Sequence, residues 1–566
     1  MMKKEKLHEK VEFTNMRELV EWLGNTYAER NAYSFRNDPV RGEVITKSFL
    51  QLRDDVRGLA TALAGIGCNG KKCVLFGKYS YEWVLTYFAV LSIGGVIVPL
   101  DKDWQGADLA DTAAMAEGDF LFCDKGLEEK AAAIAEKVTL KAEPFYLNAV
   151  ASEENSVAKL VDSGKEKFKN SDATYYNTKI DSMALGLLVF TSGTTGKGKG
   201  VMLSQNAILS DMSEVIQYVD FGAKTLGLLP LHHTYGSSVM IVGHAMIGCE
   251  VYISSGLRYI MKELKEQKPQ HLVLVPLYME SFYRKILANA KDTGKDKLLF
   301  RMIKISNFLR KFGIDLRKKL FKSVNAAFGG ELKMLISGGA PINPEIIYLF
   351  DSIGIQSLNG YGITECAPII AVNRSRRSVA GSVGPVLEID EVKIDEPNEN
   401  GEGEILVKGP NVMMGYYKNE EATAAAFTED GFFRTGDYGK LVGDVIFITG
   451  RKKNLIILSN GKNVYPEEIE NELSAVPGIL EIIVYEGQSK RGLEHNAIVA
   501  EIFPDKEYLE KNGIEDAHAY FKPFISEYNK GAVAYKKITV IKVREEEFPK
   551  NTLRKILRFK LDMTID

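Results

Sequence analysis

The stretch TSGTTGKGKG, Thr191 to Gly200, follows an apolar run, LGLLVF, and combines glycine, hydroxyl and lysine side chains. It nearly matches the phosphate-binding pattern G-x-x-x-x-G-K-[ST], with Gly193 and Gly198 at the glycine positions and Lys199 at the lysine position. Where that pattern needs a hydroxyl to hold Mg²⁺, the chain has Gly200. Backbone N–H groups and hydroxyls of such a loop still suit a polyphosphate, with the lysines as counter-charges. The sequence therefore predicts a phosphate loop whose metal ligand lies elsewhere.

Length and composition indicate a multidomain globular protein. The chain has 566 residues, of which 45% are hydrophobic and 26% charged. Its net charge of −3 gives no general reason to expect a nucleic-acid partner. The five cysteines are scattered, without a CxxC or Cys/His cluster, so neither a disulfide framework nor a zinc site is indicated. A reducing, cytoplasmic location is expected, and the charged N-terminus argues against a signal peptide.

One segment, Trp83 to Leu100, is uncharged and long enough to cross a bilayer. Gly94, Gly95 and Pro99 interrupt it. We therefore expect a buried helix, a glycine turn and a short strand, as in an α/β unit, instead of a membrane span.

From about residue 45 to 380, strand-like apolar runs alternate with helical segments, which is typical of α/β folds with mostly parallel sheets. These runs are CVLFG, VIVPL, LGLLVFTSG, EVYIS, HLVLVP and LKMLISGG. Residues 380–450 show short strands and glycine turns, which predicts a β-rich subdomain. A helix, PEEIENEL, opens a shorter unit after residues 451–454. We expect an N-terminal domain over 1–450 and an α+β C-terminal domain over 455–566.

Residues 284–322 hold thirteen Lys or Arg and three Asp, with apolar residues at helical spacing in LLFRMIKISNFLRKF. A basic amphipathic surface of this kind can dock on anionic membranes. A solvated basic helix face explains the same pattern, so both interpretations stay open.

Four motifs occur in order along the chain: FTSGTTGKGKGVMLS, GYGITE, FFRTGDYG and GRKKNLIILSNGKNVYPEEIE. Together they resemble the adenylate-forming superfamily of acyl-CoA ligases, adenylation domains and luciferases, over nearly the whole chain. The resemblance implies that the Thr191 stretch is an adenylation phosphate loop and not a Walker loop. The family loop reads TSGTTGxPKGV, so Lys199 falls on the loop lysine. Gly198 replaces the usual proline, and we expect it to change loop mobility without loss of function.

The resemblance also implies a site for ATP and Mg²⁺. Tyr361 stacks on adenine, Thr364 contacts the α-phosphate, and Glu365 binds Mg²⁺, a hard cation that favours carboxylate and phosphate oxygens. Asp437 accepts the ribose hydroxyls and Arg451 makes a second ribose contact. Without the family, these would be ordinary turn and loop residues. The remaining implied contacts are Thr191, Ser192, Gly193, Thr194, Thr195, Gly196, Gly338, Gly339, Ala340, Asn359, Gly360 and Gly362, with Gly461 beside coenzyme A.

His233, in PLHHTYG, matches the family's histidine at the acyl pocket near the reacting carboxylate. Read alone, a histidine here more often has a structural role. Lys453 falls where the superfamily places its hinge residue, about which a mobile C-terminal lid rotates.

Lys555, in FPKNTLRKILR, matches the adenylation lysine of the family pattern PKTxSGKIxR. Leu553 and Arg554 replace the usual Ser-Gly, so the loop is stiffer and more charged. Lys550 and Arg554 therefore remain alternatives for this role.

In the implied reaction, a carboxylate attacks the α-phosphorus of MgATP, giving acyl-AMP and pyrophosphate, and the thiol of coenzyme A then takes the acyl group. Lys555, Lys199, Thr364, Glu365 and His233 are the expected catalytic residues. Positioning two anions that repel each other is the main task of the first step. The basic helix before SGGAP, Ser337 to Pro341, is similar to that of long-chain fatty acyl-CoA ligases. This similarity suggests that the carboxylic acid substrate has a long chain. A carrier protein in place of coenzyme A, or a non-catalytic nucleotide- or acyl-binding regulator, are the alternatives.

Overall fold

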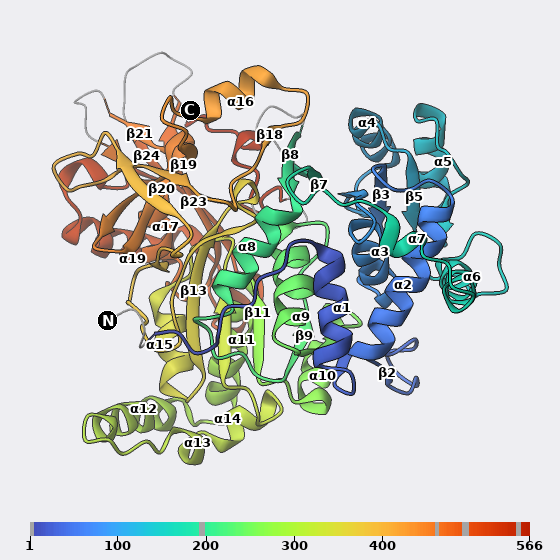
Figure 1. The fold of residues 1–566 in the computed structure, drawn as a ribbon. Coiled ribbons are helices and arrows are strands. Elements are labelled where there is room, and N and C mark those ends of the chain that lie inside the picture. The colour runs from blue at the N-terminus through green and yellow to red at the C-terminus, as the bar shows by residue number, and fades with distance from the viewer. Residues whose placement is uncertain (1–4, 192–197, 459–462, 489–496, 551–555, 566) are drawn as a thin grey trace.

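The apolar run before the phosphate loop is a central strand in the computed structural model, which describes residues 5–191, 198–458, 463–488, 497–550 and 556–565 (Figure 1). This strand, β7 (Leu185–Thr191), pairs antiparallel with β8 (Lys199–Ser204) and parallel with β4. It belongs to a seven-stranded mixed sheet with spatial order β18 (Gly415–Tyr416), β8, β7, β4 (Val96–Pro99), β3 (Lys72–Phe76), β5 (Phe120–Cys123) and β6 (Phe145–Tyr146).

Two further sheets complete the α/β part. The expected runs CVLFG, VIVPL and LGLLVFTSG lie in the seven-stranded sheet, and EVYIS, HLVLVP and LKMLISGG lie in the two further sheets. One has the order β2 (Ile45–Ser48), β1 (Asn31–Phe35), β10 (Glu250–Ile253) and β9 (Lys224–Gly227). The other has the order β11 (His271–Leu274), β12 (Met334–Ser337), β13 (Gln356–Gly362) and β14 (Ile369–Val372). The first three strands of this second sheet are parallel, so their carboxyl ends meet at one edge.

Helices cover these sheets, and Figure 1 shows where each lies. They are α1 (Met16–Thr26), α2 (Phe49–Gly65), α3 (Tyr81–Leu91), α4 (Gly106–Ala116), α5 (Glu128–Lys137), α6 (Val157–Lys169), α7 (Thr174–Asn177), α8 (Gln205–Val215), α9 (His244–Met246), α10 (Ile260–Gln267), α11 (Pro276–Asp292), α12 (Asp296–Arg310), α13 (Arg317–Leu320), α14 (Lys322–Ala327) and α15 (Pro344–Ser352). A π-helix over Tyr235–Gly243 precedes α9.

The sheet β11–β14 separates two apolar cores, because successive side chains on a strand point to opposite faces. Val273 and Ile336 face the large core that includes α8 and the π-helix. Leu272 and Leu335 face a second core, which α11, α12 and α15 close. One helical layer therefore lies between this sheet and solvent on the second side.

The β-rich region forms its own antiparallel sheet, as the glycine turns predicted. Its order is β15 (Gly384–Pro385), β20 (Val445–Arg451), β19 (Phe433–Val442), β17 (Gly403–Lys408) and β16 (Glu391–Asp395), with α16 (Glu420–Ala426) beside it. Together with the parallel sheets, it confirms the predicted α/β class.

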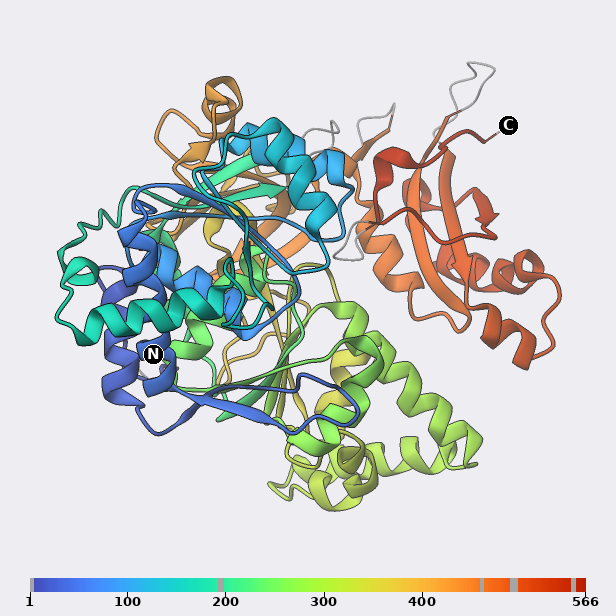
Figure 2. The ribbon, with the colours of Figure 1, turned by 90° about the vertical axis from the view of Figure 1, so that its right-hand side faces the viewer.

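The residues after 455 build separate apolar cores around a three-stranded sheet (Figure 2). The three-stranded sheet has the order β23 (Ile479–Gly487), β24 (Ala497–Pro504) and β25 (Val540–Val543). The other elements of this part are β21 (Ile456–Ile457), β22 (Asn463–Val464), α17 (Pro466–Leu473), α18 (Lys506–Lys511) and α19 (Ala517–Gly531). The expected helix PEEIENEL is α17, with Pro466 in its first turn. Polar contacts join this part to the end of α11, where Lys291 Nζ donates to Asn512 Oδ1 at 3.0 Å and Lys511 pairs with Asp292.

The span-like segment Trp83 to Leu100 is buried and divided as expected. Its first part belongs to α3, a turn with positive φ at Gly94 follows, and the last part is β4. Among the described residues, no helix is both long and apolar enough to cross a membrane.

Helices α2 and α6 pack closely because each has a glycine at their crossing. A Cβ on Gly164 would lie 1.8 Å from the carbonyl oxygen of Gly58. We expect Gly164→Ala to destabilise the N-terminal domain by roughly 1–3 kcal/mol, since the two backbones must separate. Calorimetry should show a lower unfolding temperature for that domain.

Gly106→Ala is the matched control, because a Cβ at the first residue of α4 would meet only ordinary contacts at 3.8 Å or more. Equal unfolding temperatures for the Gly164 and Gly106 variants would contradict the proposed close crossing.

Candidate active site

The phosphate loop joins two antiparallel strands, β7 and β8, and α8 begins only after β8 ends. A Walker loop instead leads directly into a helix N-terminus, so this connection agrees with the adenylation type. A Cβ on Gly200 would lie 3.1–3.2 Å from Leu188, Phe190 and Tyr417. The crowding explains why no serine or threonine stands at this position.

Asp437 joins the pocket strand β13 to the β-rich sheet. Its Oδ2 accepts a hydrogen bond from the Tyr361 hydroxyl at 2.8 Å, and its Oδ1 lies 3.2 Å from Arg451 Nε. Asp437 and Arg451 are direct neighbours across β19 and β20. Burial, followed by the charge of Asp437, raises the pKa of Tyr361, so its hydroxyl stays protonated as a donor. The structure thus brings together the three residues expected to hold adenine and ribose.

Glu365 lies in a 3₁₀ turn, Thr364–Cys366, directly after β13. Its Oε1 accepts a hydrogen bond from the Tyr416 hydroxyl at 3.0 Å. Burial raises the pKa of Glu365, and the Tyr416 bond opposes this shift by favouring the charged form. The ammonium of Lys199 lies 4.6 Å from the centre of the Tyr416 ring. Tyr416 therefore holds both the expected metal ligand and the loop lysine.

Tyr416 was not predicted from the sequence. It lies on the short strand β18, which pairs with β8 opposite Val201. Only the pairing of β18 with β8 shows that Tyr416 lies beside Glu365 and Lys199. An aromatic pair in GYYKN was the sole signal in the sequence.

The expected glycine contacts lie at the carboxyl ends of β12 and β13. Gly339 has φ +85°, a conformation that favours glycine, and a Cβ on Gly362 would lie 1.9 Å from the Pro368 carbonyl oxygen. Asn359 Oδ1 is buried without a hydrogen-bond partner in the described part of the chain. Such an acceptor suits the amino group of an adenine base. Ala340, the last residue of the expected wall, is exposed.

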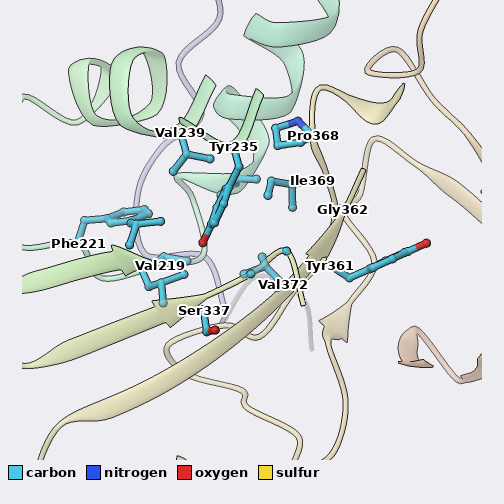
Figure 3. Close-up of a pocket in the computed structure, with 16 residues that line it drawn as sticks. Val219, Phe221, Tyr235, Val239, Ser337, Tyr361, Gly362, Pro368, Ile369 and Val372 are labelled. Carbon is cyan, nitrogen blue, oxygen red and sulfur yellow. The ribbon is translucent and has the colours of Figure 1, made fainter. Parts of the chain in front are cut away.

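An apolar pocket of about 60 Å³ lies beside these glycines (Figure 3). The Tyr235 ring stands between Phe221 on one side and Ile369 and Val372 on the other. The Tyr361 side chain points away from this group, toward the opposite side of β13. The residues that line the pocket are Val215, Val219, Phe221, Tyr235, Val239, Val273, Ile336, Ser337, Gly338, Gly339, Gly360, Tyr361, Gly362, Pro368, Ile369 and Val372.

His233 does not line this pocket, although Tyr235, two residues later, does. The Nε2 atoms of His232 and His233 are buried without a hydrogen-bond partner among the described residues, and His232 Nε2 lies 3.6 Å from Asp101 Oδ2. Burial lowers the pKa of His232 to about 4 and of His233 to about 3. Both side chains are therefore neutral at physiological pH.

Two further histidines lie behind Phe221, in edge contact with its ring. His244 Nε2 and His271 Nε2 are 2.9 Å apart, and Cys249 is near enough to complete a set of three metal-ligand atoms. The sequence predicted no such cluster. However, the Gly222 N–H donates to His271 Nδ1, so the neutral ring carries its proton on Nε2 and donates it to His244. That ordered hydrogen bond leaves no lone pair on His271 Nε2 for a metal.

Several expected site residues fall outside the described residues. They are Ser192, Gly193, Thr194, Thr195, Gly196, Gly461 and Lys555. Lys453, the expected hinge residue, lies in a 3₁₀ turn over Lys452–Asn454. Burial, followed by the charge of Arg451, lowers its pKa.

The site therefore defines a class of protein: an α/β enzyme with an apolar pocket on one side of β13 and, on the other, the carboxylates Asp437 and Glu365 with Lys199 nearby. The AMP-binding enzyme family matches residues 20–417, and the chain belongs to this family. It is an AMP-forming acid–thiol ligase, which adenylates a carboxylic acid and then forms a thioester.

Curated relatives and solved structures agree. The chain is 29% identical to a chloroplastic long-chain-fatty-acid–[acyl-carrier-protein] ligase, AEE15, of Arabidopsis thaliana, over 86% of this chain and 76% of that one. It is 28% identical to the long-chain-fatty-acid–CoA ligase FadD15 of Mycobacterium bovis, over 76% and 74%. Its fold is similar to that of ATP-bound MatB from Rhodopseudomonas palustris, with a TM-score of 0.74 at 24% identity over 96% and 97% of the two chains.

The buried histidine pair makes stability depend on pH. Burial lowers the folded-state pKa of His244 from 6.5 to about 4. As pH falls below about 6.5, the unfolded chain binds a proton that the folded chain does not, so stability is lost until the folded pKa is reached. At pH near 5 this loss is about 2 kcal/mol for one such histidine. His244→Gln should therefore lose less thermal stability than the parent between about pH 7.5 and pH 5.

His518→Gln is the control, since His518 is exposed on α19. Thermal unfolding at the two pH values measures the difference for each variant. If the His244 and His518 variants respond to acid as the parent does, the neutral pair does not contribute to acid sensitivity.

Proposed function

We propose that this enzyme activates a long-chain fatty acid with MgATP and transfers the acyl group to coenzyme A. The observation that carries the proposal is the placement of an apolar pocket and a polar nucleotide cluster on opposite sides of the end of β13. An acid bound in the pocket would present its carboxylate at Gly339, Gly360 and Gly362. The names of the relatives at 28–29% identity support a long-chain acid.

The residues present fit a nucleotide with Mg²⁺. In the proposed site, Asn359 accepts from adenine, Tyr361 lies against the base, and Asp437 and Arg451 hold the ribose. Glu365, kept in place by Tyr416, is the carboxylate that would hold Mg²⁺, which neutralises phosphate charge when bound. Lys199, Thr364 and Lys555 stabilise charge on the attacked α-phosphate.

The acyl transfer needs a second arrangement, because Lys555 would block the thiol. We propose that residues 455–566 are a mobile lid that turns at 451–454 and brings the Gly461 loop toward coenzyme A. The contacts of α18 with α11 support this proposal, because they are polar and solvent-exposed, and exposed ion pairs contribute little. His233 is proposed to lie beside the reacting carboxylate as a neutral group.

Side chains must move before a long chain fits. Small-molecule sites usually enclose roughly 300–1,000 Å³, whereas the pocket encloses about 60 Å³. The Tyr235 ring stands between Phe221 and the pair Ile369 and Val372, and among the described residues its hydroxyl makes one hydrogen bond, a long one of 3.4 Å to the Leu274 carbonyl. Displacing this ring would connect the glycine edge with the space around Phe221.

The first test is thioester formation by the purified protein with MgATP and coenzyme A, on straight-chain acids from acetate to stearate, with AMP and ADP both measured. We expect AMP, and the highest kcat/KM with long chains. Phe221 lies at the end of the pocket opposite Tyr361 (Figure 3). Phe221→Ala should therefore raise kcat/KM for the longest acids relative to medium-chain acids by roughly tenfold, because it lengthens the pocket.

Phe427→Ala is the matched control, since Phe427 packs on Phe433 and does not line the pocket. A maximum at short or aromatic acids would contradict the long-chain proposal. ADP in place of AMP would contradict the mechanism itself.

Lys555→Ala should slow adenylation by at least about a hundredfold and leave thioester formation from supplied acyl-AMP nearly unchanged. The reason is that the proposed lysine contacts only the first transition state. Exchange of pyrophosphate into ATP measures the first step, and quenched assays with acyl-AMP measure the second. Lys550→Ala is the control, because Lys550 pairs with Glu481 at 2.5 Å. Equal loss in both steps would contradict the role of Lys555 and of the lid.

A second acceptor deserves the same assay, because the Arabidopsis relative is named for an acyl carrier protein. In that case acyl-AMP would form without consumption of coenzyme A, and a carrier protein would accept the acyl group. Absence of turnover with every acid and both acceptors would favour a non-catalytic binding role.

A further inference from the structure

Helix α12 carries an outward face that the ligase site does not use. Figures 1 and 2 place α12 and α13 at an edge of the molecule, away from the β-rich sheet. Leu299 and Ile303 on the inner side of α12 are buried in the second core. Asn307 donates to Tyr348 and Ser352, and Arg310 pairs with Asp351, so α15 fixes the helix.

The outward side, which we name the α12 face, has two parallel stripes. Lys297 and Lys304 form the first stripe and Leu298 and Ile305 the second, because residues seven apart lie almost above one another on a helix, and Lys311 and Phe312 lie in the turn directly after α12. One stripe is cationic and the other apolar, and further exposed cations and aromatic residues flank them. The residues of the α12 face are Lys297, Leu298, Phe300, Arg301, Lys304, Ile305, Phe308, Lys311 and Phe312.

The exposure of the phenylalanines on the α12 face is unusual for this chain. Phe308 is 58% exposed and Phe312 68% exposed. Phe300, Phe308 and Phe312 are the strongly exposed phenylalanines of the described part of the chain. A group of exposed aromatic side chains on one surface marks an interaction site more often than chance exposure.

Between Asp296 and Asp315, the charged side chains are all positive. Residues 297–314 contain five Lys or Arg and no acidic residue. Within the described chain, only Arg310 of these five makes an ion pair, with Asp351 at 2.8 Å. The other four face solvent beside the exposed apolar side chains.

We propose that the α12 face docks the enzyme on an anionic lipid bilayer. The cations would pair with headgroup phosphates, and Leu298, Ile305, Phe308 and Phe312 would enter the boundary between headgroups and acyl chains. A second copy of this chain is a poor occupant, since the lysine stripe would face itself. The proposal that the α12 face binds membranes depends only on these observations. Its purpose, to receive a fatty acid dissolved in the membrane, rests on the proposed function.

The order of layers in the fold determines where the acyl pocket would lie relative to a docked membrane. The α12 face and the apolar pocket lie on opposite sides of the sheet β11–β14, with one helical layer outside it. An enzyme held by α12 would therefore keep its acyl pocket within one domain thickness of the bilayer.

The test is flotation of the full-length protein with two kinds of vesicle: phosphatidylcholine alone, and equal parts of phosphatidylglycerol and phosphatidylcholine. We expect binding to the anionic vesicles only. The triple variant Lys297→Gln, Lys304→Gln, Lys311→Gln should weaken this binding roughly a hundredfold. Phe308→Ser with Phe312→Ser should weaken it roughly tenfold or more with the charge intact.

The matched control is Lys159→Gln, Lys167→Gln, Lys169→Gln on α6, which removes the same charge from a helix without strongly exposed large apolar residues. Its vesicle binding should change by less than about threefold. All variants should keep parental thioester formation with a water-soluble acid such as octanoate, so failure of docking is distinct from failure of the ligase.

Three outcomes would overturn the proposal. The first is no binding, or equal binding to neutral and anionic vesicles. The second is an equal loss in the α6 and α12 triple variants, which would indicate general charge attraction. The third is unchanged vesicle binding by the α12 variant with weaker binding to an acidic carrier protein, which would assign the face to a protein partner.

Discussion

The two contacts of one carboxylate hold the site together. Asp437 accepts from Tyr361, on the strand that ends at the pocket, and lies against Arg451, at the end of the β-rich sheet. Tyr361 on β13 is thereby fixed to the hairpin of β19 and β20, although Tyr361 and Asp437 are 76 residues apart in the sequence. Because Asp437 is almost fully buried, losing either partner would leave a desolvated charge, which is costly. The position of the polar cluster relative to the pocket follows from this arrangement.

The end of β13 divides the site into a polar and an apolar side. Side chains alternate along a strand, so the Tyr361 ring turns toward Asp437 while its backbone and the neighbouring glycines line the pocket. Glycine at Gly362 is required by the close approach of Pro368. A larger residue there would separate β13 from β14 and move both sides of the site. The apolar pocket and the polar cluster therefore could not change position independently of each other.

Much of the fold was predictable, because its signals are local. The apolar runs, the turn at Gly94 and the helix opened by Pro466 depend on neighbouring residues alone, and the structure has each in its expected place. The site needed the family resemblance, since Asp437 and Arg451 meet through strand pairing and Tyr361 reaches them from a different sheet. Tyr416 and the pair His244 and His271 were missed for the same reason. Nothing in the sequence near them indicates which distant residues they will contact in the fold.

Arg451 belongs both to the contact with Asp437 and to the start of the proposed hinge. It contacts Asp437 as the last residue of β20, and the 3₁₀ turn that holds the proposed hinge begins at the next residue. In the described state both carboxylate oxygens of Asp437 already have partners, so a ribose bound there must share or replace them. If the proposed lid turns at residues 451–454, nucleotide binding and lid position would be coupled through this one side chain, without a separate signal between the two sites.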